Sequence, residues 1–130
     1  MKKERRNGKE FEWRVSIMMK ALGIRVLQHP LSCRDEGVDL IVELPTPLGG
    51  VYEAVVQCKE TFIGGEDVDR LFGTMTRKKK PFGILITGGK ASPQADKYIR
   101  ELNGRIELIK GEEFSELEKK SHIGFRSKQI

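Results

Sequence analysis

Two neighbouring segments with alternating residues constrain this chain more than any other feature. In residues 38–44 every second residue is apolar, and in residues 51–59 a mostly apolar set alternates with a more polar one. A period of two is typical of a β-strand whose two sides meet different surroundings. Residues 45–50, which contain Pro and Gly, separate the segments as a turn. The pattern therefore predicts an antiparallel hairpin.

The register of this hairpin brings three polar side chains together. With the turn centred at the midpoint of the connection, Asp39 lies opposite Val56 or Gln57, give or take one residue. Lys59 follows on the same side of its strand as Gln57 because side chains alternate. We therefore predict that Asp39, Gln57 and Lys59 gather on one face and form a site.

Helical and strand patterns alternate along the rest of the chain. Asn7 and Glu10 have the form of a helix-start capping box, and Ser92 and Pro93 suit a helix N-cap and first position. The predicted order is α-β-β-β-α-β-α-β-α, which indicates an α/β domain whose mixed central sheet is flanked by helices. The elements outside the hairpin are helices at residues 8–22, 66–79, 93–102 and 112–119, and strands at residues 24–28, 82–87 and 106–109.

Length and composition favour a single soluble, intracellular domain. The 130 residues, 38% of them hydrophobic, suffice for one core, which we expect over residues 1–118, followed by a basic and flexible tail at 119–130. No apolar stretch has the length of a membrane helix or a signal peptide, so we expect a soluble, intracellular (cytoplasmic) protein without a membrane partner. Cys33 and Cys58 lack metal-site spacing, so we expect neither a disulfide nor structural zinc.

The charge balance suits a polyanionic partner. The formal net charge is +5, and its excess lies in residues 2–6, in residues 77–80 and in the tail after residue 118. Any one such cluster is equally well explained as solvated surface. The cluster Arg77, Lys78, Lys79 and Lys80 also suits the end of a helix, where cations interact favourably with the last carbonyl groups.

The polar face of the hairpin has the residue types that phosphodiester hydrolysis requires. Such a reaction needs a cation that stabilises charge on the phosphate and helps to produce hydroxide from water. Mg²⁺ typically takes one or two protein carboxylates and keeps several waters, so Asp39 suffices as its principal ligand. Gln57 would add a side-chain oxygen or hold a water, and the backbone carbonyl of Cys58 is a further candidate ligand. The Cys58 side chain should face the core.

Two more residues complete this hypothesis. Lys59 would orient the attacking water or neutralise the phosphate, and Glu12, on the first helix, would hold a water or a second metal ion. An Asp and a Lys across a strand pair are nevertheless more often a weak ion pair than a catalytic couple. The spacing alone therefore does not establish a catalytic site.

Five short motifs follow one another along the chain. They are Gly8-Lys9-Glu10-Phe11-Glu12, Asp35-Glu36-Gly37-Val38-Asp39-Leu40, Val56-Gln57-Cys58-Lys59, Ile84-Leu85-Ile86-Thr87-Gly88 and Leu108-Ile109-Lys110-Gly111. With these motifs in this order, the chain resembles the Mrr-like restriction endonuclease family of the PD-(D/E)xK superfamily, over about residues 7–117. The resemblance implies a restriction-endonuclease-like core and an Mg²⁺-dependent activity on DNA, with Mn²⁺ expected to substitute.

The resemblance also implies a role for each site residue. Asp39 would be the metal-binding aspartate, Lys59 the catalytic lysine, and Glu12 the glutamate of the first helix. Gln57 would occupy the usual acidic position, and its neutral amide leaves the site with less negative charge. Residues expected to contact DNA are Arg34, Arg77, Lys78, Lys79 and Lys80.

Three functions fit these observations. The first is a DNA endonuclease that acts as a homodimer or as the cleavage module of a larger restriction or repair complex. The second is a structure-specific nuclease such as a Holliday-junction resolvase, which would prefer branched to linear double-stranded DNA. The third is a non-catalytic DNA-binding module with the same fold. The joint presence of Asp39, Gln57, Lys59 and Glu12 argues against the third.

Overall fold

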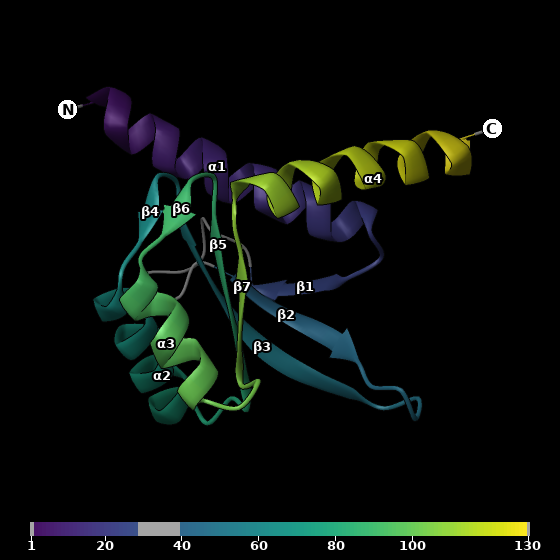
Figure 1. The fold of residues 1–130 in the computed structure, drawn as a ribbon. Coiled ribbons are helices and arrows are strands. Elements are labelled where there is room, and N and C mark those ends of the chain that lie inside the picture. The colour runs from purple at the N-terminus through teal and green to yellow at the C-terminus, as the bar shows by residue number, and fades with distance from the viewer. Residues whose placement is uncertain (1, 29–39, 130) are drawn as a thin grey trace.

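The computed structural model describes residues 2–28 and 40–129, and within these the side chains of residues 10–28 and 40–122. Figure 1 shows a central sheet with helices on both faces. The helices are α1 (Lys2–Ala21), α2 (Gly65–Lys78), α3 (Pro93–Glu101) and α4 (Gly111–Gln129). The strands are β1 (Arg25–Gln28), β2 (Leu40–Pro45), β3 (Val51–Lys59), β4 (Phe62–Ile63), β5 (Phe82–Thr87), β6 (Lys90–Ala91) and β7 (Ile106–Ile109).

The central sheet is mixed, as predicted. Its strand order is β1-β2-β3-β5-β7, in which β1, β2 and β3 pair antiparallel and β3, β5 and β7 pair parallel. Parallel neighbours need a crossover connection, and α2 and α3 provide it. The carboxyl ends of β3, β5 and β7 consequently lie at one edge of the sheet. The small parallel pair of β4 with β6 was not predicted, since two residues are too few to show a period.

Each face of the sheet is covered by one pair of helices. Alternation along β3 sends Val56 into a core shared with α1 and α4, and Val55 into a core shared with α2 and α3. Phe11 and Phe114 join the first core, and Val68 joins the second. Full burial of an aliphatic side chain stabilises the fold by about 1.5–3 kcal/mol, so the centre of β3 is held firmly from both sides.

The hairpin of β2 and β3 has the register that the sequence predicts. Leu40 lies opposite Val56, and the pairing continues without a bulge to the end of β2. The turn closes where the Gly49 N–H donates to the Thr46 carbonyl over 3.1 Å, and Gly49 adopts φ +92, which favours glycine. Residues 38 and 39 of the predicted strand lie outside the described residues.

Two predicted helix ends are wrong, whereas one predicted cap is confirmed. Asn7 is no N-cap, because α1 already begins at Lys2, where charged residues with good helix propensity extend it. α4 continues to Gln129 and not to residue 119, since no proline interrupts it; flexibility of this segment stays a prediction. Ser92 Oγ accepts a hydrogen bond from the Ala95 N–H over 3.0 Å, as an N-cap should.

None of the helices within residues 2–28 and 40–129 has both the length and the apolar character that crossing a membrane requires.

Candidate active site

The carboxyl end of β3 carries the first predicted site residue, Gln57. Its side-chain oxygen Oε1 is buried and makes no hydrogen bond to any residue that the structure describes. A buried polar atom without a partner costs about 1–3 kcal/mol, so such an atom generally has a water, an ion or another ligand beside it. Gln57 therefore offers a hard oxygen donor of the kind that Mg²⁺ accepts.

Lys59 lies two residues further along the same face of β3. Its ammonium group Nζ donates to both carboxylate oxygens of Asp67, each at 3.1 Å. The Lys59 side chain is 49% exposed, whereas that of Asp67 is 5% exposed. The ammonium group is thus held at the protein surface by a buried carboxylate on α2. Sequence reasoning assigned Asp67 no role.

The start of α2 fixes the position of Asp67. One carboxylate oxygen accepts a hydrogen bond from the N–H of Gly64, the N-cap residue, over 2.8 Å. The negative charge in the first helical turn also interacts favourably with the helix dipole. The spacing of an acidic residue three positions after the helix start was the signal from which this contact could have been suspected.

The remaining predicted residues are placed differently. Asp39 and Arg34 lie outside the described residues. Glu12 is half-buried on α1, which covers the face of the sheet opposite to the one that Gln57 and Lys59 share, so its role stays a prediction. The Cys58 side chain packs against the core beneath α1, as expected, and a role for its carbonyl also stays a prediction.

Close backbone packing explains the motif glycines beside the site. The Gly88 N–H donates to the Glu60 carbonyl over 3.0 Å, and the Gly111 N–H donates to the Gly89 carbonyl over 3.0 Å. A Cβ at Gly89 would lie 1.8 Å from the carbonyl oxygen of Thr61, and one at Gly111 would lie 2.5 Å from that of Gly88. These glycines join the segments that follow β3, β5 and β7 at one edge.

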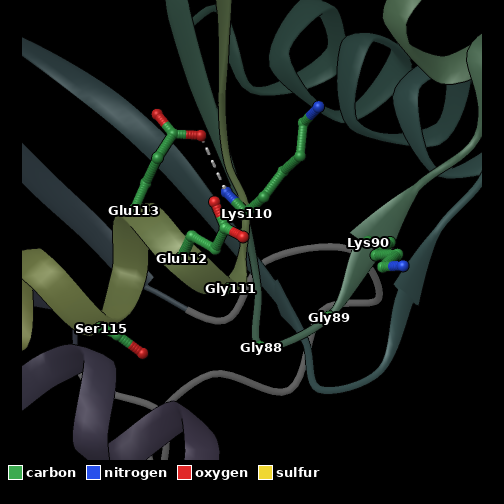
Figure 2. Close-up of a pocket in the computed structure, with 8 residues that line it drawn as sticks. All are labelled: Gly88, Gly89, Lys90, Lys110, Gly111, Glu112, Glu113 and Ser115. Carbon is green, nitrogen blue, oxygen red and sulfur yellow. Dashed lines mark hydrogen bonds between the residues drawn. The ribbon is translucent and has the colours of Figure 1, made fainter.

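Three hollows lined by described residues lie along this edge of the sheet. The largest, of about 580 Å³, is drawn in Figure 2 and contains neither Gln57 nor Lys59. In it, a Glu113 oxygen accepts from the backbone N–H of Lys110, whose ammonium group lies 3.8 Å from Asp96. Its lining residues are Gly88, Gly89, Lys90, Lys110, Gly111, Glu112, Glu113 and Ser115.

The second hollow, of about 400 Å³, lies between α1 and α4 and is bordered by Arg14. The guanidinium group donates to both oxygens of Glu118, over 2.8 and 3.1 Å, and stands 5.3 Å from the ring centre of Phe114. The hydrogen bond with Glu118 raises the pKa of Arg14 above its ordinary value. This arrangement identifies Arg14 as a link between the two helices.

The third hollow, also of about 400 Å³, is the one that Lys59 lines. The start of α2 forms its wall with Gly64, Gly65 and Asp67, and Arg70 adds a second cation whose Nη1 stands 3.8 Å from Asp67. We regard this hollow as the solvent-facing side of the candidate site, although it is smaller than the first, because a predicted catalytic group borders it.

The basic cluster at residues 77–80 lies at the far end of the domain. Lys80 forms an ion pair with Glu53, near the start of β3 and six residues before Lys59. At about 3.3 Å per strand residue, roughly 20 Å separate this cluster from Lys59. Lys79 is the helix C-cap, in the left-handed conformation. The cluster thus lies at the end of α2, where basic side chains interact favourably with the last carbonyl groups. Contact between this cluster and DNA stays a prediction.

No group of three His, Cys, Asp or Glu side chains suited to a metal ion occurs within the part of the chain that the structure describes. Asp39 lies outside that part.

The fold and this edge define a restriction-endonuclease-like α/β domain. A model of the Mrr_cat family, described as restriction endonuclease, matches residues 4–117. The chain therefore belongs to the Mrr_cat restriction endonuclease family. Comparison with curated protein sequences gave no match.

Two solved structures share the fold. The DNA modification-dependent restriction endonuclease AspBHI aligns with a TM-score of 0.66 and 20% identity, over 88% of this chain and 32% of that one. The MspJI restriction endonuclease, solved in complex with a 27-mer oligonucleotide, aligns with a TM-score of 0.62 and 19% identity, over 92% and 28% of the two chains. This chain thus spans about a third of the length of either protein.

Proposed function

We propose that this domain is a metal-dependent DNA endonuclease that hydrolyses phosphodiester bonds with Asp39, Gln57 and Lys59. Membership of a restriction endonuclease family supports an activity on DNA. The observation that carries the proposal is the buried Oε1 of Gln57, which has no hydrogen-bond partner among the described residues and lies two residues from the surface ammonium group of Lys59. A domain that only binds DNA has no need of that pair.

Asp39, Gln57 Oε1 and the Cys58 carbonyl are the groups that would hold Mg²⁺, or Mn²⁺ in its place. The donor set consists of oxygen atoms, which suits either ion. When bound, the ion would stabilise charge on the phosphate and lower the pKa of a bound water. The neutral Gln57 amide makes the bound state depend strongly on the single negative charge of Asp39.

Lys59 would act as a fixed hydrogen-bond donor. An ammonium group carries three N–H donors and no acceptor, so it can hold a phosphate oxygen or the attacking water in place. Glu12 would orient a water at the same edge. These groups position the reactants, and positioning contributes a large share of the acceleration in phosphate-transfer reactions.

DNA would approach the edge of the sheet that carries Lys59. Lys59 and Arg70 are the cations that line the third hollow, beside Glu66 and Asp67, and they would meet phosphates near the cleavage point. Residues 77–80, roughly 20 Å away, would contact the duplex at a distance from the cut, and Arg34 is the further basic candidate. One site per chain cuts two strands most simply as a homodimer, alone or within a larger restriction or repair complex.

The test uses supercoiled plasmid and a four-way junction, each incubated with the protein in Mg²⁺, in Mn²⁺ and in EDTA. Cutting of plasmid that EDTA abolishes is the expected result. Strong preference for the junction would indicate a structure-specific nuclease, whereas binding of both DNAs without cutting by folded protein would contradict the proposed activity.

A further inference from the structure

We propose that Asp67 is a positioning residue that holds the ammonium group of Lys59 at the candidate site. The catalytic meaning of this role rests on the proposed function. The pairing itself does not, because it is observed directly as two hydrogen bonds of 3.1 Å from Lys59 Nζ to Asp67.

A lysine at the surface needs a partner if its charge is to stay in one place. The Lys59 side chain is flexible and half exposed, and a lysine side chain loses about 2 kcal/mol of rotamer entropy when it is fixed. A catalytic donor must nevertheless remain within a fraction of an ångström of its working position. A neighbouring group has to supply that restraint.

Asp67 is suited to this task because it is itself immobile. Its side chain is 5% exposed, it belongs to the first turn of α2, and the Gly64 N–H binds one of its oxygens over 2.8 Å. A buried carboxylate is stable only with such partners. The carboxylate is therefore fixed by the fold before it receives Lys59.

The geometry leaves Lys59 able to act. The two hydrogen bonds to Asp67 use at most two of the three N–H groups of Lys59, so among the described contacts at least one N–H remains for a phosphate oxygen or a water. Arg70 Nη1, 3.8 Å from Asp67 Oδ1, supplies a second positive charge beside the carboxylate. Lys59 and Arg70 thus balance the formal charges of Glu66 and Asp67, which also line the hollow between β3 and α2.

Asp67 could serve only as a helix cap, or it could also position Lys59. One substitution distinguishes these two roles. Asp67→Asn keeps an amide oxygen that can accept from Gly64 N–H, but it removes the charge and offers an N–H group to Lys59. The matched control is Asp96→Asn, which changes a first-turn aspartate of α3 that pairs with Lys110 at 3.8 Å.

The first measurement is the single-turnover rate of plasmid cleavage in Mg²⁺, with DNA affinity measured in EDTA. We expect Asp67→Asn to slow cleavage at least about tenfold while DNA affinity changes less than about twofold, and Asp96→Asn to leave both unchanged. Asp67→Asn should add no further loss in a Lys59→Met background. An Asp67→Asn protein as fast as the wild type, or slowed no more than Asp96→Asn, would overturn the proposal.

The second measurement is urea unfolding of the wild type, Asp67→Asn, Lys59→Met and the double variant. If Asp67 holds Lys59, the factor by which Asp67→Asn lowers the folding equilibrium constant should be at least about twofold larger with Lys59 present than in the Lys59→Met background. Equal factors would overturn the pairing. A wild type that shows this coupling but cuts no DNA would support the pairing and contradict the proposed function, so the two failures are distinguishable.

Discussion

Leu40 lies opposite Val56 in the β2–β3 hairpin, so the first residue of β2 is paired with the residue directly before Gln57 on β3. Asp39 precedes Leu40 in the sequence, and Gln57 follows Val56. The register therefore supports the proposal that these two residues work together, with Lys59 next on the same face of β3. In that proposal Asp39 supplies the negative charge of the metal site and Gln57 a neutral oxygen.

Replacing Gln57 by Glu should strengthen metal binding and retain cleavage. The change keeps an oxygen donor at the same place and adds a negative charge toward the cation. The measurement is the Mg²⁺ concentration that gives half-maximal cleavage, which should fall severalfold. Gln57→Met, of similar length but without the oxygen, is the control and should raise it. Loss of both activity and metal binding in Gln57→Glu would show that the amide itself is required.

Replacing Gly89 by Ala should destabilise the fold, whereas the same change at Gly73 should not. The new methyl group would meet the Thr61 carbonyl at 1.8 Å, and overpacking of this kind costs about 1–3 kcal/mol. Gly73 lies within α2 and has open space around it, so alanine there should add about 0.5–1 kcal/mol. Urea unfolding of both variants checks this; a stable Gly89→Ala protein would mean that the loop can move apart.

Replacing Arg77 and Lys79 by Ala should weaken DNA binding uniformly across sequences. If each contacts one phosphate, the slope of log affinity against log salt should fall by about 1 per contact. Lys97→Ala, which removes an exposed lysine of α3, is the control. Unchanged affinity and slope in the double variant would leave the cluster with its structural role at the end of α2.

The sheet and most of the helices could be predicted from the sequence, because apolar residues recur with clear strand and helix periods and Ser92 has the form of a helix N-cap. Alternation in residues 51–59 placed Val55 and Val56 in different cores, and Ser92 marked the start of α3 correctly. The predicted helix start at Asn7 is wrong because a capping pattern involves only a few residues, whereas the helix propensity of residues 2–6 extends α1 to Lys2.

The candidate site was only partly predictable for a related reason. The pair of Lys59 with Asp67 joins a strand to the following helix, and no periodicity shows which side chain at a helix start turns back toward a strand. Similarly, charge alone marked residues 77–80 as candidates for DNA contact and gave no position for them, whereas α2 takes them to the end of β3 opposite to Lys59. The Lys59–Asp67 pair and the position of residues 77–80 both depend on how separate elements pack together. Sequence patterns describe only single elements.

The most direct test of the central claim is plasmid cleavage by Asp39→Ala in Mg²⁺, beside its DNA affinity in EDTA and its unfolding by urea. Asp39→Ala should give a folded protein whose cleavage falls at least about 100-fold, since even residues that only support metal ligands contribute about 10–100-fold. DNA affinity should stay within about threefold, because lysine and arginine contacts to phosphates dominate binding. A folded Asp39→Ala protein that cuts plasmid at the wild-type rate would show that Asp39 is not a catalytic metal ligand.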